Sequence, residues 1–303
     1  MFQAKAQNPP LAIALMLSAT LFIASSTAFA KLLGAGGLGT QMHPLQVSFG
    51  RFLFAGLALS AAAAIIRPQF TTIHWGLHIR RTACGWGGVT LMFAAVAFIP
   101  LADATAISFL NPVFAMMLAI PLLGERVGPV RWGAAALALL GALILLRPGT
   151  GAFQPAALLA LGAALILGLE IIFIKRLSER EGAMQILLVN NLIGVCIAGL
   201  AVIPVFQWPT AAQWAAMAGV GLSMAMAQTC FLNAVARAEA SFIVPFSYAT
   251  LISAAVIDFA VFGVIPVATS AIGAAIIIAG GALLAWREGR VKGHASAPQP
   301  NTE

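Results

Sequence analysis

The sequence predicts an all-α membrane protein with ten transmembrane helices, built from two inverted halves of five helices each. Three observations predict this class: an apolar composition, ten apolar runs of membrane-spanning length, and an internal repeat. Of the 303 residues, 61% are hydrophobic and 8% are charged, and the mean hydropathy is +0.98. Soluble domains have about 45–50% apolar and about 25% charged residues. The composition therefore excludes a soluble enzyme, a secreted disulfide scaffold and a disordered chain.

Ten apolar runs lie between charged residues, prolines and glycines. A helix crosses about 30 Å of hydrocarbon with about 20 residues, and the runs approach that length. They are apolar on every face, whereas strands of a membrane barrel alternate. The connections between them leave no room for a soluble domain. The expected spans are 11–33, 44–66, 82–99, 102–122, 129–147, 155–175, 184–206, 212–235, 241–263 and 267–286.

The distribution of Lys and Arg predicts that both termini are cytoplasmic. If ten spans alternate in direction from a cytoplasmic N-terminus, the outer side carries only Lys31 and Arg147, and Arg51 lies inside span two. All other Lys and Arg residues then face the cytoplasm, which is the usual bias of membrane proteins. The net charge of +7 is thus attributed to cytoplasmic loops and not to a nucleic-acid partner. The expected parts are a cytoplasmic N-terminus 1–10, a first half 11–147, a second half 155–287 and a disordered cytoplasmic tail 288–303.

The two halves of the sequence resemble each other. Ala102–Ile107 matches Ala238–Ile243, and Gly133–Leu146 matches Gly273–Trp286. Because each half holds five spans, an odd number, the two halves enter the membrane from opposite sides. Inverted repeats of this kind are common in secondary transporters and place the substrate site near the bilayer midplane, between the halves. A duplication with no role in transport is the alternative.

Short motifs in both halves resemble the EamA repeat of the drug/metabolite transporter superfamily. In the first half they are Asn111-Pro112, Leu123-Gly124-Glu125-Arg126 and Trp132-Gly133; in the second half they are Phe262-Gly263, Ile272-Gly273 and Ile277-Ile278-Ala279-Gly280-Gly281. The resemblance covers about residues 11–287. It departs from the family pattern at Val264, where an acidic residue often stands, so a role of Glu125 has no counterpart in the second half.

This resemblance implies a bacterial inner-membrane transporter with two EamA repeats. Helices one to four and six to nine would surround a central cavity, and helices five and ten would lie at the periphery. Members of the superfamily move small metabolites such as amino acids, purines, riboflavin and S-adenosylmethionine. The small-residue faces of helices five and ten could bind lipid or a second copy of the chain, so a homodimer stays open.

Three charged residues inside the spans are candidates for transport. Arg51, Glu170 and Asp258 lie in spans two, six and nine, and a charge at a helix centre costs about 2.5–3.5 kcal/mol on insertion scales. Glu170 and Asp258 are candidates for coupling to a proton, and Arg51 and Glu170 for binding substrate. For Glu170 the alternatives are a headgroup contact or a pair with a neighbouring arginine. For Asp258 they are a structural pair or a position at the outer mouth, and for Arg51 a fixed ion pair between helices. One arginine and two carboxylates favour a zwitterionic or cationic substrate.

Softer candidates for substrate binding carry amide, hydroxyl or aromatic groups. The repeat aligns Arg51 with Asn191, so the halves offer different chemistry at equivalent positions. Hydroxyls often bond to their own helix, and aromatic side chains often only pack. His74 and His78 are expected in a loop, without a metal. The candidates are Ser26, Trp86, Asn191, Gln228, Asn233 and Tyr248.

These observations together predict a secondary transporter that works by alternating access. No P-loop for ATP is found, so direct ATP drive is not expected. Export of amino acids or related metabolites is the first expectation, and uptake of S-adenosylmethionine or riboflavin is the alternative. A non-transporting membrane protein or an intramembrane enzyme is the alternative of another class. We expect no cofactor; the partners are a small-molecule substrate and membrane lipids, and a coupling proton stays open.

Overall fold

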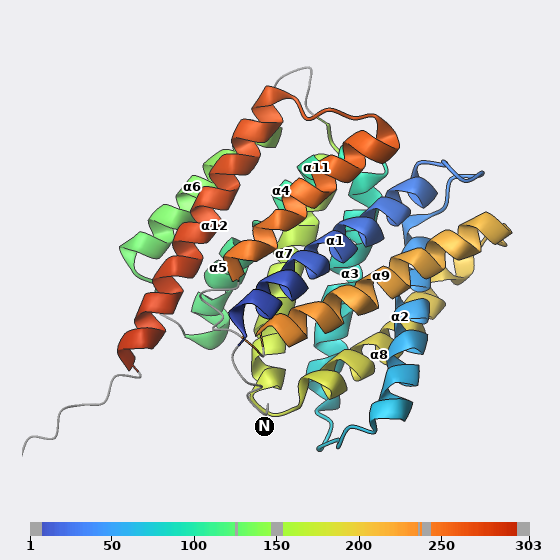
Figure 1. Ribbon diagram of the computed structural model, residues 1–303, viewed down its shortest axis with the longest axis horizontal. Helices are drawn as coiled ribbons and strands as arrows, with labels where there is room; N and C mark the ends of the chain where they lie inside the picture. Colours follow the sequence, from blue (N-terminus) through green and yellow to red (C-terminus); the bar gives the residue numbers. More distant parts are fainter. Residues whose placement is uncertain (1–7, 125–126, 147–153, 236, 238–243, 296–303) are drawn as a thin grey trace, which may run out of the picture.

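The computed structural model describes residues 8–124, 127–146, 154–235, 237 and 244–295. Within these ranges every regular element is helical (Figure 1). The α-helices are α1 (Pro9–Gly34), α2 (Pro44–Ile66), α3 (Trp75–Val96), α4 (Leu101–Ser108), α5 (Asn111–Leu123), α6 (Pro129–Leu146), α7 (Ala157–Ser178), α8 (Ala183–Val202), α9 (Ala211–Val235), α11 (Ala249–Phe262) and α12 (Ala268–Ala295). Two 3-10 helices are η1 (Ile203–Val205) and η2 (Val244–Tyr248).

The ten predicted spans are confirmed as ten helical segments in the described part of the chain. Seven of them are long and apolar enough to cross a membrane, and the last two are shorter apolar helices. The remaining segment, α3, begins at Trp75, seven residues before the predicted start of span three at residue 82. The prediction was wrong there because His78 and Arg81 are polar, yet both are buried inside the bundle.

Span four is broken in the middle, where the sequence has Asn111-Pro112. Helix α4 ends at Ser108, and α5 begins at Asn111. Proline has no amide hydrogen and its ring clashes with the carbonyl four residues earlier, which here belongs to Ser108. Span nine is also interrupted, since η2 precedes α11. The two broken spans end alike, with Gly124 and Gly263 in the left-handed conformation (φ 68° and 64°) that glycine adopts without strain.

Helix α12 is longer than the sequence predicts. It continues to Ala295, into the segment from residue 288 that was expected to be a disordered tail. That expectation was wrong for residues 288–295. The polar residues after Trp286 remove the hydrophobic signal on which the predicted end rested, but no proline interrupts the chain before Pro298.

The packing of the helices follows the inverted repeat. The helix pairs α1–α9 and α3–α7 pack side by side, and the repeat relates these two pairs to each other. The same holds for α5–α7 with α1–α11, and for α2–α9 with α3–α8. In the pairs α2–α8 and α6–α12, the two helices that pack together are themselves equivalent in the repeat (Figure 1). The halves therefore interdigitate, and almost every helix touches one from the other half.

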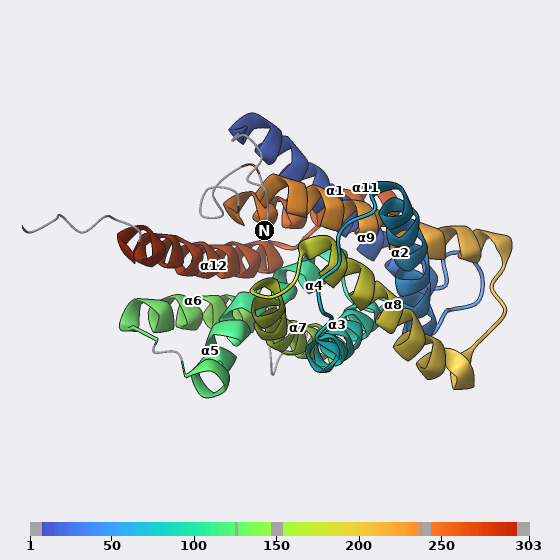
Figure 2. The same cartoon turned by 90° about the horizontal axis from the view of Figure 1, so that it is seen from below.

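Helices α6 and α12 form a separate pair at one edge of the bundle (Figure 2). Their contact is made by glycines: a Cβ atom on Gly141 would lie 2.7 Å from the Gly273 carbonyl oxygen, and one on Gly280 would lie 2.7 Å from the Ala138 nitrogen. Small residues allow such close approach of two helices. The small-residue faces expected to bind lipid or a second copy are therefore occupied within the chain.

Candidate functional site

Arg81 of α3 and Glu170 of α7 pair between the halves, and Arg51 of α2 lies close enough to act on both electrostatically. We call these three side chains the central ion cluster. Arg81 Nε lies 3.2 Å from Glu170 Oε1, and Arg81 Nη1 donates to the Ile186 carbonyl at 3.2 Å. Arg51 and Arg81 both act electrostatically on Glu170. The pair with a neighbouring arginine, one alternative for Glu170, is thus present.

A glycine makes room for the Glu170 carboxylate. Gly85 of α3 is buried, and a Cβ atom there would lie 2.8 Å from Glu170 Oε1. One turn further, a Cβ atom on Gly88 would lie 2.7 Å from Leu167 Cγ of α7. Helices α3 and α7 therefore approach closely, and the carboxylate lies directly against the backbone of α3.

Arg51 is buried, and no residue in the described part of the chain forms an ion pair with it. The residue is 5% exposed, and its Nε and Nη1 atoms have no hydrogen-bond partner among the described residues. Its Cζ atom lies 4.4 Å from the centre of the adjacent Phe52 ring. No described carboxylate forms an ion pair with Arg51, because Glu170 pairs with Arg81. The cluster therefore carries two positive charges and one negative charge in a region of low dielectric constant.

Three further predicted site residues carry buried polar atoms that have no partner in the described part of the chain. They are Trp86 through Nε1, Asn191 through Oδ1 and Gln228 through Oε1. Asn191 uses its amide nitrogen on the Leu187 carbonyl of its own helix, at 2.8 Å. Buried polar atoms of native proteins are nearly always hydrogen-bonded. Together with Arg51 they form a set that we call the open polar groups: Arg51, Trp86, Asn191 and Gln228.

The other predicted residues have local partners. The Ser26 hydroxyl donates to the Val220 carbonyl at 2.9 Å and joins α1 to α9. Asn233 lies near the end of α9, where its Oδ1 accepts from Arg237 at 2.9 Å. Tyr248 packs on Phe109, with ring centres 5.1 Å apart, where the two interrupted spans meet. The structure does not show Asn233 or Tyr248 in contact with the central ion cluster.

Asp258 lies at one end of the bundle and is fully paired. Its Oδ1 is 2.6 Å from Lys31 Nζ of α1, and its Oδ2 accepts a hydrogen bond from the Ala102 amide at the start of α4, at 3.0 Å. Asp258 is 0% exposed. The structural ion pair considered for this residue is therefore present, and we call its side of the bundle the Asp258 end.

A second polar cluster lies at the side of the bundle opposite the Asp258 end, and we call this side the Glu181 end. The Glu181 carboxylate accepts from the amide and Nδ1 of His74, from Nε2 of His78 and from Nε2 of Gln185, at 2.7–2.9 Å. A carboxylate only accepts, so both imidazole nitrogens donate. Burial alone would raise the pKa of Glu181, but the bonds from His78 and His74 outweigh it and hold the pKa below its usual range.

The sequence does not predict these partner residues. The polar run from Arg67 to Arg81 interrupts the apolar pattern, so it predicts a loop at His78 and Arg81. Lys31 is expected only as the end of span one. A signal was present in the sequence: Lys31 is one of two basic residues expected on the outer side, and Asp258 is an acidic residue of an apolar span near that side.

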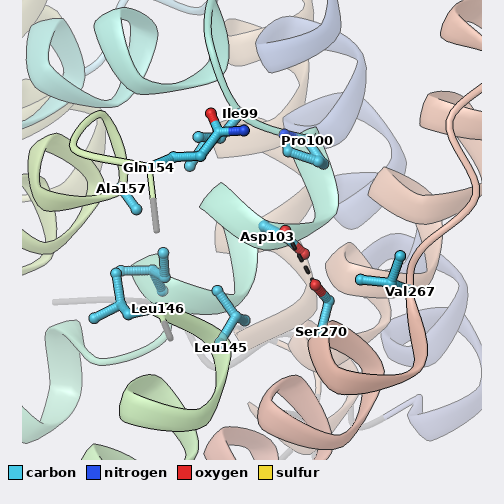
Figure 3. Close-up of a pocket in the computed structure, with 10 residues that line it drawn as sticks. Ile99, Pro100, Asp103, Leu145, Leu146, Gln154, Ala157, Val267 and Ser270 are labelled. Carbon is cyan, nitrogen blue, oxygen red and sulfur yellow. Dashed lines mark hydrogen bonds between the residues drawn. The ribbon is translucent and has the colours of Figure 1, made fainter. Parts of the chain in front are cut away.

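An outlying cavity of about 290 Å³ lies between α4, α6, α7 and α12 at the Asp258 end (Figure 3). Its walls are mostly apolar, and Asp103, Gln154 and Ser270 supply the polar atoms. The Ser270 hydroxyl donates to Asp103 Oδ2 at 3.1 Å. None of its lining residues belongs to the central ion cluster, so this cavity is separate from the candidate site.

The bundle of interdigitated inverted halves, with a charged cluster between them, is the architecture of a multi-pass membrane transporter. The chain belongs to the EamA-like transporter family, whose sequence profile matches residues 10–147 and 154–286. These two ranges coincide with the two halves of the helical bundle. The family is one of transporters and not of enzymes, so the chain moves a small-molecule substrate.

Several relatives carry names that state a cargo, and three of them represent the different cargoes. The chain is similar to a riboflavin transporter of Vibrio cholerae serotype O1, with 31% identity over 70% of this chain and 72% of the relative. It is similar to an S-adenosylmethionine uptake transporter of Rickettsia prowazekii, with 24% identity over 80% and 82%. It is also similar to the pseudopaline exporter CntI of Pseudomonas aeruginosa, with 26% identity over 61% and 66%.

Proposed function

We propose that this protein is a secondary transporter that takes up a small heterocyclic nutrient, with riboflavin as the first candidate. The observation that carries the proposal is the set of open polar groups. Arg51, Trp86, Asn191 and Gln228 come from four helices of both halves, and each holds a buried polar atom for which the described residues supply no partner. Buried donors and acceptors of this kind stabilise a bound ligand that supplies the missing hydrogen bonds.

The names of the relatives support the choice of riboflavin. The riboflavin transporter is 31% identical to this chain, more than the S-adenosylmethionine transporter at 24%. Riboflavin presents a flat ring with carbonyl oxygens and one ring N–H group. The oxygens suit the donors of Arg51 and Trp86, and the N–H suits an acceptor such as Gln228 or Asn191. The half-buried indole of Trp86 also offers a surface for stacking.

Two other cargoes are tested alongside riboflavin. Export of amino acids or related metabolites was the first expectation from the sequence, and the similarity to an exporter supports outward transport. S-adenosylmethionine uptake is supported by the long match to its transporter. The three differ in direction or in charge, so one set of flux measurements separates them.

The candidate site residues have different roles in a transporter that works by alternating access. The open polar groups and Glu170 bind the substrate, and Ser26 holds α1 against α9 beside them. Glu170 is the candidate for coupling to a proton. Asp258 acts at one end of the bundle with Lys31, while Asn233 and Tyr248 support the helix ends.

The chain lies in a bacterial inner membrane with both termini in the cytoplasm, and a homodimer is not required.

The test uses purified protein reconstituted in liposomes. Labelled riboflavin, S-adenosylmethionine and a mixture of amino acids are offered one at a time, with and without a pH gradient. We expect riboflavin to enter faster than in protein-free liposomes and to be competed by unlabelled riboflavin. Flux of amino acids alone would overturn the proposal in favour of export. Thiol labelling of single cysteines placed in the 35–43 and 67–74 connections of intact cells tests the orientation.

A further inference from the structure

We propose that Arg51 selects the substrate by charge, so that the site accepts neutral or anionic solutes carrying acceptor oxygens and rejects cationic ones. This proposal deepens the proposed function, because it names the chemistry that the central ion cluster recognises. It departs from the zwitterionic or cationic substrate favoured by counting charged residues in the sequence.

The ion pairs of the structure change the charge balance on which that expectation rested. Asp258 forms an ion pair with Lys31 at the end of the bundle, so it contributes no free negative charge at the site. Arg81 lies within α3 and forms an ion pair with Glu170. The site therefore contains Arg51 and Arg81 against one carboxylate, which leaves an excess of one positive charge.

The excess charge belongs to a residue that is built into the bundle. Arg51 is 5% exposed, and its Nε and Nη1 atoms donate to no described group. Its backbone packs tightly, since a Cβ atom on Gly221 of α9 would lie 2.9 Å from the Arg51 carbonyl oxygen. A buried guanidinium is costly when donors such as Nε and Nη1 lack acceptors, and the cost is offset when a ligand brings acceptor oxygens to them.

Only the first half of the inverted repeat carries a positive charge at this position. Gln46 and Gln185, near the starts of α2 and α8, make matching hydrogen bonds, each to the connection that follows the other helix. The position equivalent to Arg51 in the second half is therefore Asn190, and not Asn191 as the sequence predicts. Asn191, one residue further on, has an Oδ1 atom that is buried without a partner among the described residues. One half therefore offers donors with a positive charge, and the other offers a neutral acceptor. A substrate with acceptor oxygens at one edge and a donor at another has one preferred orientation between the two helices.

Two ligand pairs that differ in charge test the proposal by thermal shift of the purified protein. S-adenosylhomocysteine and S-adenosylmethionine differ by one methyl group and one positive charge, and riboflavin and riboflavin 5′-phosphate differ by the phosphate. We expect S-adenosylhomocysteine to bind the wild type about tenfold or more tightly than S-adenosylmethionine. The flavins are both expected to bind. Arg51→Gln should remove the difference within the adenosyl pair, whereas Arg51→Lys should keep part of it.

Controls separate charge selection from a general loss of structure. Arg80→Gln removes an exposed arginine of the same helix as Arg81 and should keep the wild-type preference. Glu170→Gln adds one net positive charge and should increase the preference for S-adenosylhomocysteine. The ligand-free Arg51→Gln protein should melt no lower than the wild type, because a ligand-binding charge, unlike a structural one, is unsatisfied without its ligand.

Three outcomes would overturn the proposal. They are tighter binding of S-adenosylmethionine than of S-adenosylhomocysteine, an unchanged preference in folded Arg51→Gln, and no binding of any of the four ligands. A large loss of stability in ligand-free Arg51→Gln would also overturn it, since Arg51 would then be structural. Binding with the expected preference but without riboflavin flux would contradict only the proposed function.

Discussion

The ammonium of Lys31 lies 2.6 Å from the carboxylate of Asp258, and this pair joins the first helix of one half to span nine of the other. The same carboxylate caps the start of α4 through the Ala102 amide, and the ammonium also lies 4.4 Å from the centre of the Phe262 ring. Three helices from both halves thus meet at one ion pair. In the alternating access proposed above, contacts between the halves open at one end, and this pair would have to break for the Asp258 end to open.

Asp258→Ala should lower the free energy of unfolding by about 3–5 kcal/mol, because it leaves the buried Lys31 ammonium without its counter-ion. Unfolding in detergent, followed by the melting of helical circular dichroism, measures the change. The double variant Lys31→Met with Asp258→Leu should lose less stability than the two single variants added together. Arg80→Gln is the control and should behave as the wild type. Additive single losses would contradict a direct interaction.

The Glu181 end should respond to acid. The hydrogen bonds from His78 and His74 hold the folded pKa of Glu181 below its usual range despite burial. A lowered folded pKa adds stability that is complete above the unfolded value of about 4.3 and is lost as the pH falls through the folded value. The melting temperature of the wild type should therefore fall more steeply below about pH 4.3 than that of Glu181→Gln.

The matched control for this acid response is Glu179→Gln, which changes an exposed carboxylate two residues away. It should keep the pH dependence of the wild type. At pH 7, Glu181→Gln should be less stable than the wild type by about 1.5–3 kcal/mol, the usual contribution of a hydrogen bond to a charged group. Equal acid sensitivity of Glu181→Gln and wild type would show that other carboxylates cause the loss.

The peripheral helix pair offers a test of close packing. Gly141→Ala should destabilise the protein by about 1–3 kcal/mol, because its methyl group would meet the Gly273 carbonyl oxygen at 2.7 Å. Gly133→Ala, on the same helix, meets nothing within 4 Å and should be neutral or slightly stabilising. The melting temperatures of both variants in detergent test this prediction. Equal stability would mean that α6 and α12 can move apart at little cost.

The fold could be predicted from the sequence because its main signals are local. Apolar runs of about 20 residues mark spans wherever charges are absent, and the repeated motifs report the inversion. The start of α3 was missed for the same reason, since His78 and Arg81 are polar. Their burial depends on Glu181 and Glu170, which lie about 100 residues away in sequence. No local pattern contains that information.

The candidate site was predicted only in part. Arg51 and Glu170 were found because a charge inside an apolar run is conspicuous, and the structure brings them into one cluster. Their relation to Arg81 could not be read from the sequence, so the net charge of the site had the wrong sign. Asp258 gave the same local signal as Glu170, yet its partner Lys31 is 227 residues away. Pairing across the repeat decides which buried charges stay free.

The contact between Gly85 and Glu170 gives the sharpest test of the central ion cluster in transport. Gly85→Ala places a methyl group 2.8 Å from Glu170 Oε1, so the carboxylate must move away from α3 and from Arg81. The carboxylate is the far end of a flexible side chain, so the main effect of the displacement is on the Arg81–Glu170 pair and not on packing. We expect substrate flux in liposomes to fall by about tenfold.

Gly87→Ala is the matched control for this last experiment, because its methyl group would meet only Ile166 Cγ2 at 4.0 Å. Both substitutions put alanine at a helical glycine of α3, so their effect on helix propensity is the same. A difference in flux between them therefore reports the position of the Glu170 carboxylate. Equal flux with equal melting temperatures would show that transport does not depend on the Arg81–Glu170 pair.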